Sequence, residues 1–284
     1  MATDLSRGHE RGWPGGRMHA WISTRMDQFS YFDRQLGHPD WAHADVLDFG
    51  GNNGNLLLDP DCTIDPARYW CLDVVRAALE QGRQGHPLAH FELYDRYNFE
   101  FNPTGTPGLP IPDLGRRFDY IVSYAVFAHT SKAEMRELVE QLLPMLADGG
   151  ALAFTFIDPY FDPPEGWLRD WEPQVDNLTW RLSAGPIPDR VAAEVAAHAR
   201  GSELTWATLV NNEDLVLESG DDWIRMGDER SQYIAFCTEE HMRSIFPGAE
   251  VLPPVPPERH SCCVIRTPSP IVHSGPSGGA PDGS

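Results

Sequence analysis

The stretch VLDFGGNNGNLL at residues 46–57 decides the fold class. A short apolar run over 45–49 is typical of a buried parallel strand, a glycine- and asparagine-rich turn follows it, and a helix start comes next. In an open α/β sheet the turn after the first strand is where a ligand approaches the backbone, because glycine has no Cβ to hold it away. The stretch therefore predicts the ligand-binding edge of such a sheet.

Strands and helices alternate along the chain after this turn. The helix over 132–147 carries its apolar residues on one face, and the pair Gly149–Gly150 is expected to cap it. Strands separated by helices or long crossovers predict an α/β fold with a doubly wound, mostly parallel, seven-stranded sheet. The last two strands, joined by prolines, are expected to pair antiparallel at the sheet edge. We expect strands over 45–49, 69–72, 89–94, 118–124, 151–157, 249–252 and 261–266, and further helices over 74–84 and 238–246.

Composition divides the chain into six segments. Both ends are polar and rich in glycine, and the C-terminal end also in proline and serine, which predicts a mobile N-terminus and a disordered tail. After the fifth strand the alternation breaks in a stretch that holds five of the nine tryptophans, which we interpret as a substrate-side insertion. The expected segments are a mobile N-terminus (1–17), a helical cap (18–44), the α/β core (45–158), the insertion (159–230), the closing helix and strands (231–267) and the tail (268–284).

Charge and composition exclude several classes of partner. The chain of 284 residues is 41% hydrophobic, and 22 basic against 42 acidic residues give a formal net charge of −20. Such a balance repels polyanions, so we expect no nucleic acid and no membrane partner. No apolar run reaches the roughly 18 residues that suggest a membrane helix, and no secretory signal is evident, so we expect a soluble, cytoplasmic protein. The five cysteines form no C-x-x-C pair and no zinc-finger spacing, and no metal is expected.

Two aspartates flank the predicted ligand edge. Asp73, at the end of the second strand, stands where a carboxylate can accept both hydroxyls of a ribose, although it can also cap the following helix. Asp48 precedes the turn, where a carboxylate repels a diphosphate but complements the cationic amino group of a methionine moiety. This charge argument favours S-adenosylmethionine over NAD, and a Rossmann-type nucleotide-binding oxidoreductase is the alternative.

These features together resemble the class I S-adenosylmethionine-dependent methyltransferases, whose first motif is V-L-D-x-G-x-G-x-G. The resemblance runs from about residue 46 to 157 and, more weakly, to the closing strands; it implies a Rossmann-like fold. Asn52 departs from the motif, where the family has glycine, but asparagine tolerates left-handed backbone angles. The tryptophan-rich insertion and arginine-heavy composition are similar to bacterial methyltransferases that act on small secondary metabolites.

The resemblance implies a set of cofactor-binding residues. The turn would shape the methionine end of the pocket, Asp73 would hold the ribose, and the end of the third strand would meet adenine through Asp95, with Arg96 or Tyr97 beside the ring. Ser123 ends the strand that borders the sulfonium, and Tyr31 or Arg25 would close over the cofactor carboxylate. The expected cofactor residues are Tyr31, Asp48, Gly50, Asn52, Gly54, Asp73, Asp95, Arg96 and Ser123.

A protic acceptor also needs a base. For a hydroxyl or a protonated amine, His129, Tyr124 and Glu165 are the candidates, whereas an electron-rich carbon needs little help from a base. His129 can instead cap the helix that begins at 132. The acceptor is expected to be a small aromatic or apolar molecule, with transfer to carbon, nitrogen or oxygen left open, and a non-catalytic cofactor-binding protein is a further alternative. The N-terminal helix, with its aromatic residues, is a candidate contact for a homo-oligomer.

Overall fold

A computed structural model describes residues 27–98, 101–158, 206–209, 224–225, 234–255 and 260–268. Its main sheet has seven strands in the order β3-β2-β1-β4-β5-β10-β9. Only β10 runs antiparallel to both of its neighbours, so the predicted mostly parallel, doubly wound sheet and its antiparallel closing pair are confirmed. The strands are β1 (Val46–Phe49), β2 (Tyr69–Asp73), β3 (His90–Leu93), β4 (Phe118–Ser123), β5 (Leu146–Phe156), β9 (Glu250–Leu252) and β10 (Ser261–Arg266).

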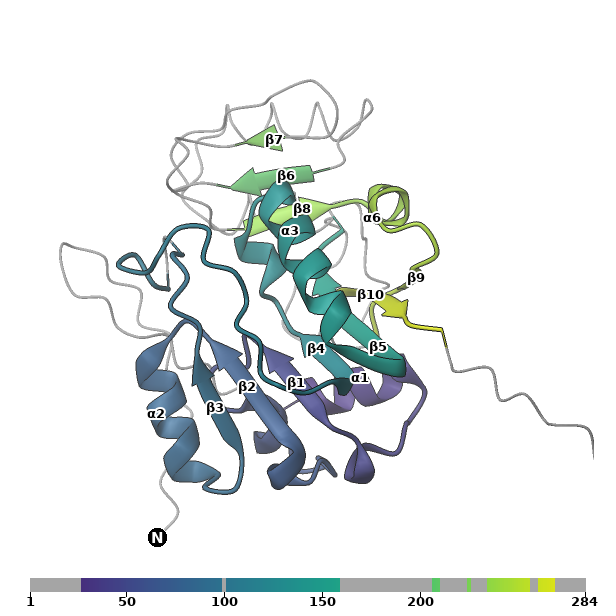
Figure 1. Cartoon of the computed structure of the whole chain (residues 1–284). Helices are drawn as coiled ribbons and strands as arrows, with labels where there is room; N and C mark the ends of the chain where they lie inside the picture. The colour runs from purple at the N-terminus through teal and green to yellow at the C-terminus, as the bar shows by residue number, and fades with distance from the viewer. Residues whose placement is uncertain are drawn as a thin grey trace, which may run out of the picture.

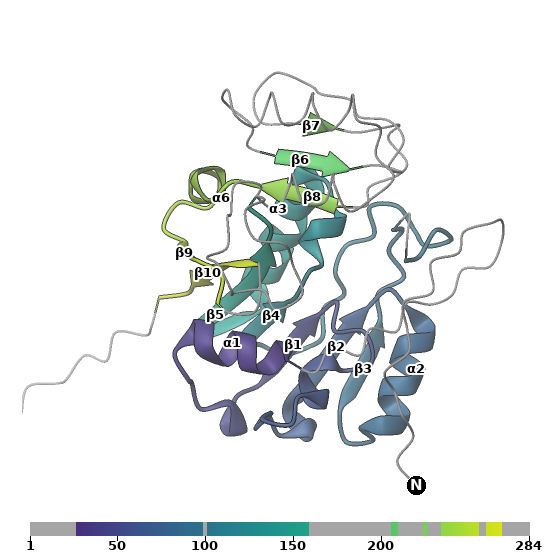
Figure 2. The same cartoon turned by 180° about the vertical axis from the view of Figure 1, so that it is seen from behind.

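Helices cover both faces of the sheet (Figures 1 and 2). Helix α3 (Lys132–Leu142) and helix α6 (Glu239–Ile245) pack on one face. Helix α1 (Gln28–Leu36) and helix α2 (Arg76–Gly85) pack on the other. The pattern follows from alternation along the strands, because each strand sends successive side chains to opposite faces. Each face thus has an apolar core of its own, and the carboxyl ends of the parallel strands share one edge.

The third helix ends earlier than predicted. It stops at Leu142, and a 3₁₀ turn (η5, Leu143–Met145) replaces its expected last part. Pro144 explains the difference, because proline cannot donate the helical hydrogen bond and its ring clashes with the preceding turn. The prediction that Gly149–Gly150 caps the helix is wrong: both glycines lie inside β5, where Gly149 has φ +77° and the pairing with β4 shifts register.

The helix expected directly after the glycine-rich turn is also reduced. Only a 3₁₀ helix, η2 (Asn55–Leu58), forms there, and Asp59 leaves it in an extended conformation. Pro60 gives the reason, since a residue before proline is disfavoured in the helical region. Of the N-terminal helix predicted from residue 18, the structure describes α1 from Gln28 onward. Helix α1 packs against η2.

A second, three-stranded sheet has the order β7-β6-β8. It comprises β6 (Trp206–Leu209), β7 (Ile224–Arg225) and β8 (Ile234–Cys237). The backbone N–H of Cys237 donates to the carbonyl of Ile157, just beyond β5, at 2.9 Å. The small sheet therefore lies at the carboxyl edge of the main sheet, as both views show (Figures 1 and 2). The six segment boundaries proposed from composition stay predictions.

Candidate cofactor and acceptor site

The turn after β1 has the backbone that its sequence requires. Gly50, Asn52 and Gly54 have φ of +81°, +56° and +90°, so asparagine does take the left-handed conformation in place of the glycine of the motif. A Cβ built on Gly50 would lie only 2.1 Å from Cγ2 of Val126, which follows β4. The turns after β1 and β4 therefore interlock. Strands β1 and β4 are adjacent in the sheet order, at the switch point where open α/β sheets bind ligands.

Asp48 lies beneath this turn rather than on its surface. Its side chain is 1% exposed and accepts a 2.6 Å hydrogen bond from the Tyr69 hydroxyl. A Cβ on Gly51 would lie 2.4 Å from the Asp48 carboxyl group, so only glycine allows the turn to close over it. Burial raises the pKa of Asp48 to about 7, opposed by the hydrogen bond from Tyr69 and reinforced by the nearby charge of Asp73. Near neutral pH the carboxyl group can therefore gain or lose a proton.

Asp73, the last residue of β2, ties the turn to the second strand. Its carboxylate accepts from the backbone N–H groups of Asn52 and Val75, each at 2.7 Å. Burial raises its pKa, and these backbone hydrogen bonds oppose the rise. The N-cap of α2 is Val75, so Asp73 bonds that residue instead of occupying the cap position itself. Because a carboxylate offers about four lone-pair sites, Asp73 keeps the capacity to accept ribose hydroxyls that the sequence predicts.

Three buried polar atoms in the turn after β1 and at the end of β4 have no hydrogen-bond partner among the described residues. They are Oδ1 of Asn53, Oδ1 of Asn55 and Oγ of Ser123. Leaving such an atom unsatisfied in the interior costs about 1–3 kcal/mol. Asn53 and Asn55 belong to the turn and the start of η2, and Ser123 ends β4. The amide oxygens match ligand groups that donate hydrogen bonds, such as an ammonium or a hydroxyl, so the residues present fit S-adenosylmethionine.

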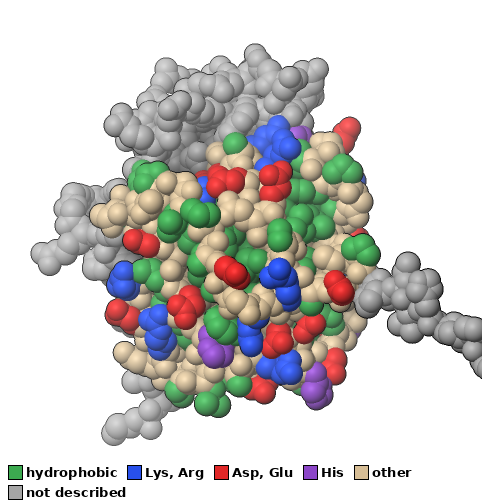
Figure 3. Space-filling view, in the orientation of Figure 1, with side chains coloured by type: hydrophobic (Ala, Val, Ile, Leu, Met, Phe, Trp, Pro, Cys, Tyr) green, Lys and Arg blue, Asp and Glu red, His purple; other side chains and the backbone are tan. Residues whose placement is uncertain are grey.

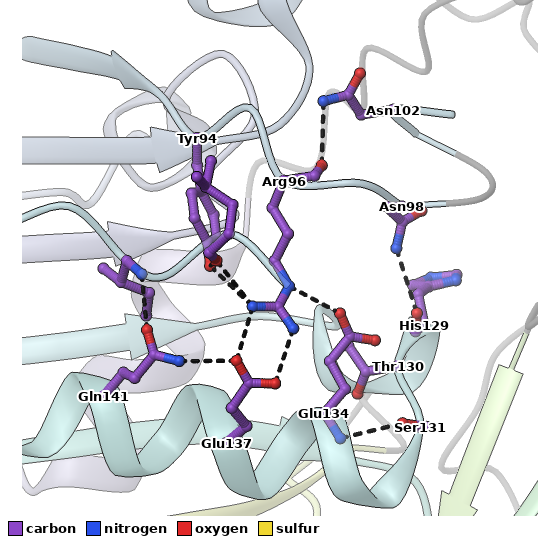
Figure 4. Close-up of polar contacts among 12 residues, drawn as sticks. Tyr94, Arg96, Asn98, Asn102, His129, Thr130, Ser131, Glu134, Glu137 and Gln141 are labelled. Atoms are coloured by element: carbon purple, nitrogen blue, oxygen red, sulfur yellow. Dashed lines mark hydrogen bonds and ion pairs between the residues drawn. The ribbon is translucent and has the colours of Figure 1, made fainter. Parts of the chain in front are cut away.

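The predicted adenine residues after β3 face different surroundings. Asp95 is exposed, and its carboxylate accepts from Nδ2 of Asn102 at 3.0 Å. Arg96 is buried and its guanidinium extends to α3, as Figure 4 shows. It donates to Glu134 at 3.1 Å and to both carboxylate oxygens of Glu137 at 3.0 Å. Arg96 is thus held by α3, and its contact with an adenine ring stays a prediction, as does that of Asp95.

This arginine cluster fastens the loop after β3 to the helix that follows β4. Burial disfavours the charged guanidinium, but the hydrogen bonds to Glu137 and Tyr94 outweigh burial and raise the pKa of Arg96. In the same cluster the hydrogen bond from Arg96 lowers the pKa of Glu137, whereas burial raises that of Glu134. Arg96 therefore stays charged near neutral pH.

The three candidate bases have different positions. His129 ends the 3₁₀ helix η4 (Phe127–His129); its carbonyl accepts from Asn98 at 3.4 Å (Figure 4), and its ring lies edge-on to Phe101. The cap of α3 is Ser131, so His129 does not cap that helix. Tyr124 directly follows β4 and is buried there. Glu165 lies outside the described residues, as do Arg25 and most of the insertion.

Tyr31 belongs to the core of the α1 face. Its side chain is fully buried, and its hydroxyl donates to the carbonyl of His260 at 2.8 Å. Its neighbours Phe29 and Phe32 are also buried inside the chain. These aromatics are therefore not exposed, and the subunit contact predicted through this helix stays a prediction. Closure of Tyr31 over the cofactor carboxylate stays a prediction.

The sequence interpretation missed His260. The residue precedes β10, and its Nδ1 lies 3.2 Å from the hydroxyl of Tyr124. Because β10 runs antiparallel to β5, it starts beside the carboxyl end of β5, and the residue before it lies at the same edge of the sheet. The strand predicted over 261–266 places His260 at the site only once its antiparallel pairing with β5 is known.

The chain is similar in part to known methyltransferases. Residues 47–152 match a family model described as a methyltransferase domain. Solved structures similar to this chain include the glycopeptide N-methyltransferase MtfA complexed with S-adenosyl-L-homocysteine, at 10% identity over 89% of this chain and 94% of that one, with a TM-score of 0.47. Streptomyces venezuelae DesVI shares 14% identity over 86% and 93% of the two chains, with a TM-score of 0.45. An S-adenosylmethionine-dependent methyltransferase from Clostridium acetobutylicum shares 11% over 86% and 92%, with a TM-score of 0.47. Over residues 47–152 the chain is thus similar to the methyltransferase domain family.

Proposed function

We propose that this protein transfers a methyl group from S-adenosylmethionine to a small aromatic or apolar acceptor of the natural-product kind. The observation that carries the proposal is the β1–β4 edge, where a turn with three left-handed residues covers one buried carboxyl group and is tied to a second. Carboxyl groups at this place suit a cationic amino acid joined to a nucleoside and oppose a diphosphate.

Within the proposal, each part of the cofactor has a candidate partner. The unpartnered oxygens of Asn53 and Asn55 would accept from the amino group or a hydroxyl, and Asp73 would accept from the ribose. When bound, the cofactor supplies an electrophilic methyl group on a positively charged sulfur. The chain's own task is to hold an acceptor in line with that group and to exclude water, which can contribute about 7–11 kcal/mol in favourable cases.

The acceptor side is inferred from composition. Five of the nine tryptophans fall within 159–230, and aromatic faces can bind flat acceptors or stabilise positive charge as it develops. The second sheet, part of which comes from this segment, lies at the carboxyl edge where an acceptor must enter. Both features support a small molecule as the acceptor.

Charge supports the absence of a nucleic-acid partner. The chain carries a formal net charge of −20, and on the face in Figure 3 acidic and basic side chains are interspersed. A polyanion needs a continuous basic surface. None of the helices in the described part of the chain is long and apolar enough to cross a membrane. We further propose a cytoplasmic location, supported by five cysteines that are all free thiols.

Isothermal titration with S-adenosylhomocysteine and with NADH tests the proposal. The protein should bind the first at one site and not the second. Asp73→Asn should weaken S-adenosylhomocysteine about fivefold, because a charge-assisted hydrogen bond is worth about 1 kcal/mol more than a neutral one. The exposed aspartate Asp61 is the matched control, and Asp61→Asn should bind like wild type. Binding of NADH instead would identify the oxidoreductase alternative, and cofactor binding without turnover on any acceptor would identify a non-catalytic binding protein.

A further inference from the structure

We propose that Tyr124 and His260 form a proton-accepting pair on the acceptor side of the cofactor site. Tyr124 Oη takes the proton of a hydroxyl or amine acceptor while its own proton passes to Nδ1 of His260. The inference rests on the proposed function and deepens it, because it commits the acceptor to oxygen or nitrogen.

Topology brings the two residues to one edge. Tyr124 follows the last residue of β4, and His260 precedes the first residue of β10. Ser261 pairs with Phe156 at the carboxyl end of β5, so β10 starts at the edge where β4 ends. The Tyr124 hydroxyl and His260 Nδ1 are 3.2 Å apart, and the ring centroids are 5.0 Å apart. Chain segments 136 residues apart thus meet through a polar contact.

The pair is held in place from several elements. Tyr31 of α1 donates to the backbone carbonyl of His260 at 2.8 Å and packs edge-on against the Tyr124 ring at 5.5 Å. The next residue, Ala125, has φ +58°, a left-handed conformation that costs a residue other than glycine about 1–2 kcal/mol. Its N–H donates to Oγ1 of Thr155 at 2.7 Å, which holds this backbone. Strain of this kind is concentrated at functional sites, where the surrounding structure maintains it.

The same backbone lies against the cofactor turn. Val126, two residues after Tyr124, fills the space that a side chain on Gly50 would need. Tyr124 therefore lies two residues from a contact with the predicted cofactor turn, and its side chain contacts His260. A phenol in this position is 7% exposed in total, so bulk water has little access to it.

The proton balance explains why the phenol needs the imidazole. At neutral pH a tyrosine is protonated and can accept a proton only as it gives up its own. The acceptor's O–H or N–H bond breaks, its electron pair stays on the heteroatom that is methylated, and the proton joins Tyr124 Oη. The original phenol proton moves to His260 Nδ1, which leaves an imidazolium. Because His260 acts through Tyr124, it is a positioning residue.

The first test is the tautomer of His260. The mechanism requires that Tyr124 donates to an unprotonated Nδ1, with the proton of the neutral ring on Nε2. Long-range ¹H–¹⁵N correlation spectra of the full chain saturated with S-adenosylhomocysteine report this directly, with His260→Asn to assign the signal. We expect the Nε2–H form in wild type and a shift toward a mixture in Tyr124→Phe. An Nδ1–H form, or a spectrum unchanged by Tyr124→Phe, would overturn the proposal.

The second test is turnover with radiolabelled S-adenosylmethionine on a panel of simple phenols, secondary amines and electron-rich arenes. Tyr124→Phe and His260→Ala should lower kcat about 10²–10⁴-fold with little change in KM, the usual contribution of a base. His260→Asn keeps a hydrogen-bond acceptor but cannot take a proton, so its kcat should be as low as that of His260→Ala. Tyr120→Phe makes the same chemical change on the same strand, away from the edge, and should keep the wild-type kcat.

The outcomes separate the two proposals. If S-adenosylhomocysteine fails to bind wild type, the proposed function fails. Suppose instead that S-adenosylhomocysteine binds and methyl transfer occurs, but His260→Asn has the wild-type kcat. His260 then orients Tyr124 without taking a proton, and the inference is wrong. Turnover of arenes alone would also contradict it. Urea unfolding of each variant shows whether a loss of kcat comes from a loss of structure.

Discussion

The buried carboxyl group of Asp48 should make the stability of this protein depend on pH in an unusual direction. Its pKa is about 7 in the folded chain against an ordinary value of 3.8. Between these values the folded state keeps the proton while the unfolded state has lost it. The folded state then binds more protons, so the free energy of unfolding falls as pH rises. The contribution is fully present below about pH 4 and is lost as pH rises through about 7.

The size of the effect follows from the shift. About three pKa units at 1.36 kcal/mol each give a loss of about 4 kcal/mol across the whole range. Because the pI is about 4.8, where solubility is poor, the practical window is pH 5.5 to 8.5. About 2 kcal/mol of the change should fall within that window by the same linkage relation.

Asp48→Asn isolates the contribution of this one group. Asparagine is neutral at every pH and its Oδ1 can still accept from the Tyr69 hydroxyl. Urea unfolding at four pH values should show the variant gaining about 2 kcal/mol on wild type from pH 5.5 to 8.5. Asp61→Asn removes an exposed carboxylate and should follow the wild-type slope. If Asp48→Asn also follows it, the carboxyl group titrates normally and the reasoning is refuted.

Three further predictions concern the framework of the site. Gly50 and Gly37 both have positive φ, +81° and +78°, but only at Gly50 would an added Cβ meet another side chain. Gly50→Ala should therefore lower the free energy of unfolding in urea by about 1–3 kcal/mol more than Gly37→Ala. Equal losses would show that the turns after β1 and β4 do not interlock. Arg96→Met should cost about 1–3 kcal/mol, because it removes the buried guanidinium and leaves the partly exposed carboxylates of Glu134 and Glu137 without their partner. Glu137→Gln, at a half-exposed partner, should cost less than about 1 kcal/mol, and similar losses for both variants in thermal unfolding would argue against a buried anchor. Burial raises the pKa of Cys263 to about 12. Its thiol should therefore react with an aromatic disulfide at pH 8 only on unfolding, and rapid reaction in the native state would contradict this burial.

The backbone of the turn at the proposed cofactor edge could be predicted from sequence because its signals are local. The spacing of Gly50, Asn52 and Gly54 fixes the backbone of the turn, and all three have positive φ. Asp73 ends its strand at the predicted residue, and its carboxylate does reach the turn. Strands and turns of this kind are determined by residues close together in the sequence, so a single sequence is enough to predict them.

The other half of the site depends on contacts between distant segments. The position of Arg96 after β3 predicts a contact with the cofactor. In the structure its guanidinium instead forms ion pairs with Glu134 and Glu137, which lie three residues apart on one face of α3. The polar face of this amphipathic helix was the available signal. His260 reaches Tyr124 only because β10 runs antiparallel, so its part could be found only once the strand order was known.

Hydrogen–deuterium exchange of the full chain with and without saturating S-adenosylhomocysteine tests the central claim most directly. The claim is that the ligand occupies the edge formed by the turns after β1, β2 and β4. The account predicts slower exchange in peptides that cover 50–55, 73–75 and 123–126, with the start of β4 at the opposite edge unchanged. Unchanged exchange in these three segments at saturation, or protection centred on another edge of the sheet, would contradict it.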